Sequence, residues 1–513
     1  GLSNRQARSL YGMSRSLADL GRLHEAVASV ERAIDMAEGH RSSLSTPQLR
    51  SFYMAQRQNY YVHLVGALVE LHRQADSAES DYLQQALAVS ERSRARTLVD
   101  MINESSQLES RTGDSAERDE LLRQLAETRY RLQGGTAQPL TEEETIEARQ
   151  RLANLENQLN LLEIQWREAN PAYAELVDPT LLDADGVQAM LDGGTALLQY
   201  TLGEDFGFVF LVTRDNVRVW PLPGNAAIES RARPVYELLR SPPAAGPGNT
   251  DWREPVAALA GLILPPAEEL EQARMLVVAD GVLQYLPFSV LLDAQRTSVA
   301  DPAAGYEVVN VPSMSMLATQ RASLAGRDDP DLTLALFADP VFSLDDRRLA
   351  EATTASRELA TQPVSRRLPD PTEPRNLPRL PATRYEAETI AELVAPEQRV
   401  IRTGFDANRA AILDFDFSGF RVVHFATHGK VDSRYPSLSW LAFSQFDPQA
   451  RAQEGLLRLN DIYEMDLAAD LVTMSACDTA LGREIRGEGL AGLVQGFMYA
   501  GARSVVASLW QVP

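Results

Sequence analysis

The spacing of apolar residues changes near Asn170-Pro171, and this change restricts the folds that the chain can adopt. Before that point, apolar residues recur three and four positions apart, which is the period of amphipathic helices. After it, short apolar runs bounded by polar turns predict strands, and they alternate with helical stretches such as 384–393. We therefore expect a helical first part followed by an α/β region. The predicted strands are 196–202, 206–212, 217–220, 275–279, 332–338, 421–427, 470–476 and 503–509.

The first helical part carries the spacing of a tetratricopeptide repeat, in which small residues let two antiparallel helices approach closely. A second helical pair between residues 57 and 96 matches the repeat less well, and a plain helical bundle is the alternative. In either case, stacked helical pairs commonly present a concave surface that binds a partner. The matching positions of the first pair are Leu10, Met13, Ser14, Leu17, Gly21, Ala26, Val30 and Ala33.

Residues 111–170 predict a helical hairpin. Gly134-Gly135 and Pro139 break its first arm, and Thr141 with Glu144 forms a capping box for the second arm. Apolar positions along the second arm are spaced by four and three, which is typical of a coiled-coil seam. We expect the hairpin to act as a spacer, and a lever that transmits partner binding is the alternative. The seam consists of Ala148, Leu152, Leu155, Leu159, Leu162 and Trp166.

At 513 residues the chain should contain two to four domains. Its charge limits the partners that it can bind. The net charge of −22 argues against binding to nucleic acid or to an anionic membrane. The same charge would attract basic proteins. We find neither a signal peptide nor an apolar run of membrane-spanning length, and therefore expect a cytoplasmic protein. Because the chain begins at Gly1 without a methionine, we expect it to be a fragment.

The single cysteine, Cys477, directly follows the apolar run 470–476, and His428 directly follows the run 421–427. Of the six histidines, only His424 and His428 lie near these runs. One cysteine excludes an intrachain disulfide and makes a cysteine–histidine zinc site improbable, so we expect neither a metal nor another cofactor. A cysteine–histidine nucleophile is the leading hypothesis. The other histidines are His24, His40, His63 and His72.

The position of these two residues suits catalysis, because side chains at the carboxyl ends of parallel strands leave the core and meet at one edge of the sheet. The His428 imidazole would assist deprotonation of the Cys477 thiol and then protonate the leaving amine.

Each of these assignments has a structural alternative without catalysis. A cysteine at the end of an apolar run is often a small core residue, and we expect His424, inside its strand, to be a packed histidine rather than the base.

Three segments together resemble the CHAT domain, a caspase-like protease module shared with separase-type proteins and often found behind tetratricopeptide repeats. The segments are LVVADG at 276–281 with LPF at 286–288, VHFATHG at 423–429, and LVTMSACDT at 471–479. The resemblance covers residues 170–513. It implies a degenerate, pseudo-protease half at 171–325 and an active half at 326–513, behind repeats at 1–110 and a connector at 111–170.

The resemblance also implies roles for particular residues. By similarity to caspases, the backbone N–H groups of Gly429 and Cys477 would stabilise the oxyanion. Similarity to separase-type members implies a basic P1 residue in the substrate. Related chains continue past residue 512 into an acidic stretch that helps to bind this side chain, whereas this chain stops at Pro513. Asp432 and Asp478 are candidate contacts for a basic side chain, and loop or helix caps are the alternative.

Two further segments of the sequence have more than one interpretation. The run GEGLAG at 487–492 matches the dinucleotide-binding fingerprint, but no acidic residue follows to hold a ribose, so we reject it and expect a loop before a helix at 490–499. Arg483 and Arg486 in this loop are candidate sites of self-cleavage. Residues 343–381 are rich in Pro, Arg, Asp and Glu with little periodicity, and we expect an exposed loop there.

The sequence thus predicts a helical, tetratricopeptide-like region followed by an α/β caspase-like domain with two halves. The predicted function is a cysteine endopeptidase that acts on proteins and is regulated or targeted by a protein partner at its helices. A non-catalytic interaction scaffold is the alternative. A third possibility keeps Cys477 as a nucleophile for acyl transfer to a group other than water.

Overall fold

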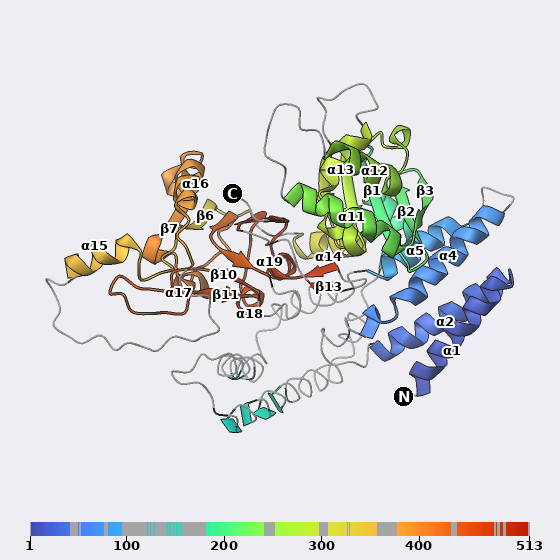
Figure 1. The fold of residues 1–513 in the computed structure, drawn as a ribbon, viewed down its shortest axis with the longest axis horizontal. Helices are drawn as coiled ribbons and strands as arrows, with labels where there is room; N and C mark the ends of the chain where they lie inside the picture. Colours follow the sequence, from blue (N-terminus) through green and yellow to red (C-terminus); the bar gives the residue numbers. More distant parts are fainter. Residues whose placement is uncertain are drawn as a thin grey trace. The chain divides into compact units, whose positions relative to one another are not determined.

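In the computed structural model the chain divides into two compact units, each containing a five-stranded sheet (Figure 1). The first unit contains Gly1–Asn103, Asp178–Ser323 and Glu484–Ala491, and the second contains Glu104–Val177, Leu324–Arg483 and Gly492–Pro513. The domain limits expected from the sequence stay predictions. The structure describes residues 2–41, 50, 53–75, 81–94, single positions between 121 and 158, 181–240, 252–296, 306–325, 327, 329–356, 377–431, 439–476, 479, 483–485 and 489–510.

The chain begins with the predicted helical pair, α1 (Leu2–Asp19) and α2 (Leu23–Arg41). Gly21 lies in the turn between them with a φ of 74°, a left-handed conformation that glycine adopts without a steric penalty. Ala26 has no exposed surface, and its carbonyl accepts a hydrogen bond of 2.7 Å from the buried Ser14 hydroxyl. The small residues on the predicted spacing therefore lie where the two helices pack together.

Four more helices of the first unit pack with this pair on one face of its sheet. Apolar residues of α4, α5 and α10 form one buried cluster with inward-facing side chains of the strands, such as Leu197 and Phe210. The helical region thus supplies the cover for one side of the sheet, as Figure 1 shows for α4 and α5. The helices are α4 (Gln58–Gln74), α5 (Tyr82–Arg92), α10 (Ala184–Ala189) and α14 (Met314–Ser323).

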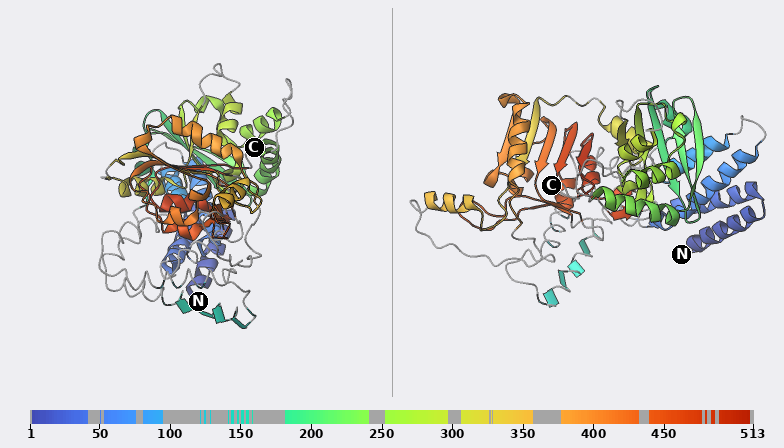
Figure 2. Two further views of the ribbon diagram at one scale, coloured as in Figure 1. Left: turned by 90° about the vertical axis from the view of Figure 1, so that its left-hand side faces the viewer. Right: turned by 45° about the horizontal axis from the view of Figure 1, so that its top comes forward.

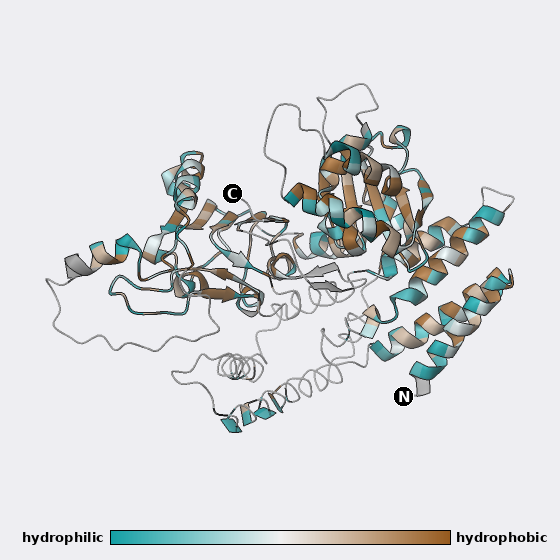
Figure 3. Cartoon of the chain, viewed as in Figure 1, coloured by the Kyte–Doolittle hydropathy of each residue, from teal (hydrophilic) through white to brown (hydrophobic). Residues whose placement is uncertain are grey.

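The sheet of the first unit has the strand order β3-β2-β1-β4-β5. β1 is antiparallel to β2 and parallel to β4. All residues of β1 are buried, because both faces of this strand are covered. Leu197 lies in the cluster formed with the helical region, and the even-numbered side chains lie in a second cluster formed with α11, α12 and α13. Figure 3 shows the apolar character of these strands. The elements are β1 (Thr195–Leu202), β2 (Phe206–Val212), β3 (Val217–Pro223), α11 (Asn225–Arg240), α12 (Arg253–Ile263), η1 (Ala267–Glu269), β4 (Arg274–Val278), η2 (Gly281–Tyr285), α13 (Phe288–Arg296) and β5 (Glu307–Asn310).

A buried ion pair joins the end of α5 to this sheet. The Arg94 guanidinium lies 3.2 Å from Asp280 Oδ2, and the side chains of both residues are nearly inaccessible to solvent. The same carboxylate accepts a hydrogen bond of 2.7 Å from the backbone N–H of Leu202. One turn earlier, the buried Glu91 accepts a bond of 2.5 Å from the backbone N–H of Ser315, and its burial raises the pKa of this carboxyl.

The second unit contains a sheet in which all five strands are parallel, in the order β15-β12-β8-β6-β7. The predicted strands at 332–338, 421–427 and 470–476 are confirmed to within one residue, and the strand at 503–509 is shorter than predicted. Figure 2 shows these strands side by side in its right-hand view. The strands are β6 (Leu332–Ala338), β7 (Arg399–Thr403), β8 (Phe420–Ala426), β12 (Leu471–Ser475) and β15 (Val505–Ala507).

Side chains alternate between the two faces of this sheet. Phe337, Phe425 and Met474 lie in a cluster that includes residues of α17, α18 and α19, whereas Leu336 and Ala426 lie in a cluster with α16. The helices are α16 (Pro381–Glu392), α17 (Arg409–Leu413), α18 (Leu459–Tyr463) and α19 (Leu493–Tyr499), with short turns η3 (Pro396–Gln398) and η4 (Gly404–Asp406). Helix α16 confirms the helical stretch predicted at 384–393.

Smaller elements correct two predictions. Residues 343–381 include a helix, α15 (Arg347–Ser356), so this part is not a loop throughout. The predicted helix at 490–499 begins at Leu493, because Gly489–Ala491 forms strand β14. β14 pairs with β13 (Arg483–Ile485), while β9 (Gly429–Lys430), β10 (Trp440–Ala442) and β11 (Leu456–Arg458) form a three-stranded sheet.

Most of the predicted helical hairpin lies outside the described residues. Its capping box is confirmed, because Thr141 Oγ1 accepts a bond of 3.2 Å from the Glu144 N–H and the Glu144 carboxylate accepts a bond of 2.8 Å from the Thr141 N–H. Ala148 and Leu155 of the predicted seam are buried. Within the described ranges, no helix is both long and apolar enough to span a membrane.

Replacement of Asp280 by Asn should destabilise the first unit. The amide keeps an acceptor for the Leu202 N–H but leaves the buried Arg94 charge without its counter-ion, which typically costs about 3–5 kcal/mol. Urea denaturation followed by hydrogen exchange of α5 would measure the loss. The matched change Asp215→Asn, at an exposed position between β2 and β3, should alter stability by less than about 0.5 kcal/mol. Equal effects of the two substitutions would contradict the importance of the ion pair.

Candidate active site

Two neighbouring parallel strands bring the His428 and Cys477 segments to the same edge of the sheet. β8 and β12 are paired in register, with Ala426 opposite Ser475. Beyond the last pair, the backbone N–H of Thr427 donates to the Ser475 carbonyl over 3.2 Å. His428 therefore follows closely on the end of β8, at the edge where β12 also ends.

His428 is partly exposed and is held by contacts on several sides. Its ring lies edge-on to Phe342, with 5.0 Å between the ring centroids. Its backbone carbonyl accepts a bond of 2.8 Å from the N–H of Ala442 in β10. Its Nε2 lies 2.8 Å from the backbone carbonyl oxygen of Pro378. Because a carbonyl oxygen only accepts, this contact requires that Nε2 carries the hydrogen and donates it.

Gly429 makes the close approach between the two segments possible. A Cβ at this position would lie 2.7 Å from Thr479 Cγ2, closer than side-chain packing allows, and 3.2 Å from Ala476 Cβ, which is a tight contact. Ala476 and Thr479 flank the Cys477-Asp478 pair. Gly429 thus lies directly against Ala476, which precedes the candidate nucleophile, and Thr479, which follows it by two positions.

The backbone of Gly429 has a defined direction in the small sheet. Gly429 pairs with Leu441 of β10, and the neighbouring pair, His428 with Ala442, is joined by a hydrogen bond. Hydrogen-bonded and non-hydrogen-bonded pairs alternate along an antiparallel ladder. The N–H of Gly429 therefore points away from β10, which is a requirement for the oxyanion donor that the sequence predicts.

Hydrogen bonds hold the chain where it leaves β12. The buried hydroxyl of Thr479 donates to the Ala476 carbonyl over 3.2 Å and accepts the N–H of Ser508 over 3.2 Å. The Ser508 hydroxyl also donates to the Ala476 carbonyl. Ala476, directly before the candidate nucleophile, and Thr479, two positions after it, are thereby joined to each other and to the chain that follows β15.

Three of the predicted site residues, Cys477, Asp478 and Asp432, lie outside the described part of the chain. The sequence assigned them the roles of nucleophile and of contacts to a basic side chain. These assignments stay predictions, as do the oxyanion roles of Gly429 and Cys477. The possible self-cleavage site at Arg486 also lies outside the described residues.

A carboxylate that the sequence analysis did not identify connects α16 to both strands. Glu386 Oε1 lies 3.0 Å from His424 Nε2, and Glu386 Oε2 accepts a bond of 3.1 Å from the Ser475 hydroxyl. Burial alone would raise the pKa of Glu386, but the hydrogen bonds from His424 and Ser475 outweigh it and lower this pKa below its usual value. His424 is buried in β8 and directed at α16, as expected for a packed histidine.

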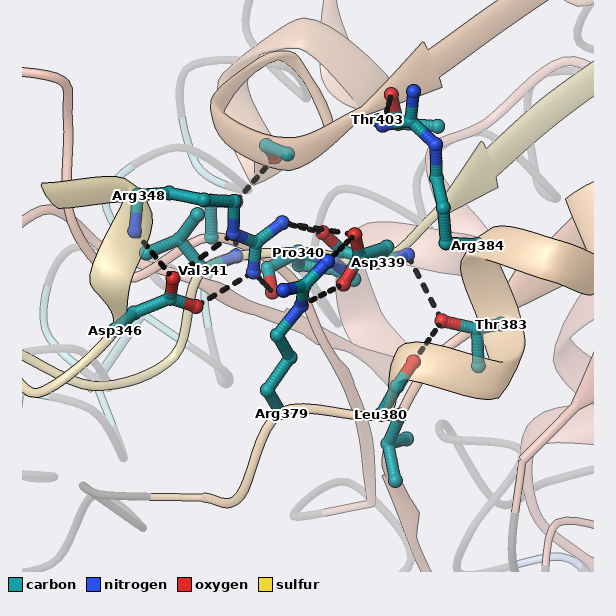
Figure 4. Close-up of polar contacts among 12 residues, drawn as sticks. Asp339, Pro340, Val341, Asp346, Arg348, Arg379, Leu380, Thr383, Arg384 and Thr403 are labelled. Carbon is teal, nitrogen blue, oxygen red and sulfur yellow. Dashed lines mark hydrogen bonds and ion pairs between the residues drawn. The ribbon is translucent and has the colours of Figure 1, made fainter. Parts of the chain in front are cut away.

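A second carboxylate, Asp339, follows β6 at the same edge, because Ala338 pairs with Ala426. Asp339 is buried, and both oxygens accept bonds from Arg379, at 2.8 and 2.7 Å (Figure 4). Arg348 lies 3.0 Å from the same carboxylate and donates to the Asp339 backbone carbonyl over 2.8 Å. Arg348 also binds Asp346 through two hydrogen bonds, which lower the pKa of Asp346 although burial opposes this shift.

The backbone of Asp339 adopts a left-handed conformation, with a φ of 48°. This conformation is uncommon outside glycine, although Asp tolerates it better than most residues. Surrounding bonds hold it in place, because its N–H donates to Thr383 Oγ1 over 3.2 Å and its carbonyl accepts the N–H of Gly404 over 3.1 Å. A conformation of this kind, fixed by its surroundings, is frequent at functional sites.

The two missed carboxylates differ in what the sequence reveals about them. Asp339 directly follows an apolar strand and precedes a proline, so the same rule that selected His428 and Cys477 selects it. Glu386 lies on an amphipathic helix among other charged residues, and no sequence signal separates it from its neighbours.

Among the described residues, no group of three or more His, Cys, Asp or Glu side chains is arranged to hold a metal ion.

Comparison with known proteins adds one positive finding. Residues 253–513 match the sequence model of the CHAT domain. No curated protein matches the chain. The matched segment includes every described residue of the candidate site.

Replacement of Gly429 by Ala should disturb the contact between the two segments. The added Cβ would meet the buried Thr479 side chain, and overpacking of this kind costs about 1–3 kcal/mol. Thermal denaturation would measure the effect. Gly419 offers the matched control, because a Cβ there meets nothing within 4 Å. If Gly419→Ala and Gly429→Ala lower the melting temperature equally, the proposed steric restriction is wrong.

Replacement of Glu386 by Gln should lower stability by about 1 kcal/mol at pH 7, after allowance for its partial exposure. Because the folded-state pKa is lowered, this carboxylate contributes stability above its unfolded pKa, and the contribution is lost as the pH falls through the folded-state pKa. The difference between wild type and variant should therefore shrink in acid. Glu388→Gln, at an exposed position paired with Arg384, should show a difference below about 0.5 kcal/mol. A pH-independent difference for Glu386→Gln would contradict the assignment.

Proposed function

The chain belongs to the CHAT domain family, which is caspase-like, and from this premise we propose that it is a cysteine endopeptidase whose chemistry is carried by His428 and Cys477. The observation that carries the proposal is the placement of Gly429 directly against Ala476 and Thr479. This contact supports a histidine and a cysteine that act at one site, since His428 precedes Gly429 and Cys477 follows Ala476.

The chemistry follows from these two side chains. The imidazole of His428 accepts the thiol proton of Cys477, and the resulting thiolate attacks the carbonyl carbon of the scissile peptide bond. The same proton then goes to the leaving amine, which departs and leaves an acyl-enzyme. A water molecule releases the acyl group in the second half of the cycle. The N–H of Gly429 is directed away from β10, which supports its role as one donor to the oxyanion.

The proposed function also includes a class of substrate and a kind of protein partner. We propose protein substrates with a basic P1 side chain, contacted by Asp432 and Asp478, and a protein partner or activator that binds the helical region. The strongly negative net charge of −22 supports basic partners. Met13 of α1 and Leu20 in the turn before α2 are exposed apolar side chains that such a partner could contact.

A non-catalytic interaction scaffold is the second candidate, and the helical pair at the start of the chain favours it, because such pairs can bind a partner without any chemistry at the strand ends. The bond from His428 Nε2 to the Pro378 carbonyl does not separate the two candidates, because it fixes the tautomer in which Nδ1 is the base. The scaffold and the protease differ in whether Cys477 is chemically activated, and a covalent probe distinguishes them.

Labelling by an electrophilic peptide probe with a P1 arginine should give an adduct on Cys477. His428→Ala should lower the labelling rate by about 10²–10⁴-fold, because general acid–base assistance contributes this much. Intact-mass analysis and peptide mapping would locate the adduct. The experiment should be carried out with the protein alone and with candidate partners.

Two controls define the result. His24→Ala makes the same substitution at an exposed position of α2 and should leave the labelling rate unchanged. A probe with a P1 aspartate tests the expected preference for a basic side chain. If Cys477 reacts no faster than a free thiol with either probe and under every partner condition, the endopeptidase proposal is wrong and the scaffold is favoured.

A further inference from the structure

The residues that lead into α16 supply the carbonyl that contacts His428. The Pro378 carbonyl oxygen accepts a bond of 2.8 Å from His428 Nε2, which leaves Nδ1 as the nitrogen without hydrogen in the neutral ring. A backbone carbonyl orients a ring only if the peptide that carries it is itself held. Residues 377–380 belong to no helix or strand, so side chains and neighbouring segments must hold this peptide.

Arg379 anchors the peptide that it shares with Pro378. Its Nε and Nη2 donate to the two oxygens of the buried Asp339 carboxylate over 2.8 and 2.7 Å (Figure 4). Paired bonds between a guanidinium and a carboxylate fix the orientation of both groups. Because the Pro378 carbonyl and the Arg379 nitrogen lie in one planar peptide, an anchored Arg379 limits the directions in which this carbonyl can point.

Asp339 is a rigid point of attachment. It directly follows β6, which pairs with β8, the strand that His428 follows. Its N–H donates to Thr383 Oγ1 over 3.2 Å, and Arg348 lies 3.0 Å from its carboxylate. The anchor of the Pro378 carbonyl is thus built on the strand next to the one that positions the histidine.

The residues at the two ends of the segment 377–380 are held separately. Leu377 packs against a buried apolar cluster that includes Phe342. The Leu380 carbonyl accepts a bond of 2.7 Å from the Thr383 hydroxyl. These contacts retain the segment when Arg379 is replaced, but neither of them is made by the peptide between residues 378 and 379. The Arg379 side chain therefore has the most direct effect on the direction of that peptide.

The two arginines on Asp339 contribute differently. Arg348 has 18% of its side chain exposed, and it also binds Asp346 and the carbonyl of Pro340. Arg379 has 41% of its side chain exposed. When Arg379 is replaced, Arg348 still neutralises the buried carboxylate, so the charge balance at this edge of the sheet does not depend on Arg379. The contribution of Arg379 is the placement of its own segment.

We propose that Asp339 is a positioning residue for His428 and acts through Arg379 and the peptide that follows Pro378. This inference rests on the proposed function, because it assigns a further residue to the same reaction. With the peptide anchored, the hydrogen on Nε2 is held, and Nδ1 is kept as the base that accepts the Cys477 proton. Without the anchor, the ring adopts several orientations, and fewer molecules have the base in its reactive position.

The direct test follows the hydrogen on His428 Nε2 and does not require peptidase activity. In protein that is isotope-labelled in histidine, a hydrogen-bonded ring N–H exchanges slowly with water and gives a proton resonance. His428→Ala identifies this resonance by its absence. Arg379→Ala should accelerate the exchange of this hydrogen by about tenfold or more, since it removes two hydrogen bonds between charged groups. Arg379→Lys keeps the charge without the paired geometry and should give an intermediate rate.

Labelling of Cys477 by the P1 arginine probe is the second readout. Arg379→Ala and Asp339→Asn should each lower the labelling rate by about 10–10²-fold, because a displacement of about 1 Å at a catalytic group can cost 10²-fold. If Asp339 acts through Arg379, the double variant should be no slower than the slower single variant. Losses that multiply in the double variant would overturn the proposed path through Arg379.

Controls separate positioning from a loss of structure. Arg384→Ala removes an exposed arginine of α16 that binds Glu388 and Thr403, and it should leave both readouts unchanged. Because Arg348 remains on Asp339, Arg379→Ala should retain the circular dichroism spectrum of the wild type. A His428 resonance that is missing from the wild type would overturn the proposal, as would equal exchange rates in wild type, Arg379→Ala and Arg379→Lys.

The two readouts also separate this proposal from the proposed function. If the His428 hydrogen exchanges faster in Arg379→Ala but Cys477 of the wild type reacts no faster than a free thiol, the placement of the ring by Asp339 stands and the endopeptidase proposal fails. If Cys477 is labelled rapidly and equally in wild type and Arg379→Ala, and the exchange rate does not change, the endopeptidase stands and the positioning role fails.

Discussion

The parallel pairing of β8 with β12 is the constraint on which the candidate site depends. In-register pairing through Ala426 and Ser475 makes both strands end at one edge, where His428 and Ala476 follow them. Parallel strands also need both faces covered. α16 covers one face and carries Glu386, so the helix that completes the core also fixes the polar side chains of His424 and Ser475.

The two sheets share an electrostatic arrangement at their strand ends. In the first unit the buried Asp280, shortly after β4, is neutralised by Arg94 from the helical region. In the second unit the buried Asp339, directly after β6, is neutralised by Arg348 and Arg379. A buried carboxylate without a counter-ion is strongly unfavourable. Each buried carboxylate is therefore neutralised by arginine from outside the strands, but Asp280 pairs with one buried residue and Asp339 with two that are partly exposed.

Most of the strands could be predicted from the sequence because their apolar runs have the length and composition that a sheet buried on both faces requires. The limits of β2 and β6 agree with the predicted runs, and His428 was correctly expected to follow the end of its strand. Helix α15 was missed because its Arg-rich and Thr-rich sequence has little apolar periodicity. The contacts of Glu386, Asp339 and Pro378 join segments far apart in the chain, and local pattern contains no information about such pairs.

The position of β1 determines which fragments of this protein can keep the first sheet intact. The segment that matches the family begins at Arg253, which is also the first residue of α12, whereas β1, β2 and β3 precede it. β1 lies at the centre of its sheet and pairs with β4, so a polypeptide starting at residue 253 would leave β4 as an open edge. It would also expose Met275 and Val277, which are completely buried in the intact chain. The span of family likeness is therefore shorter than the span that can fold independently, and recombinant fragments of the first sheet need to include residue 195 and the helices that cover it.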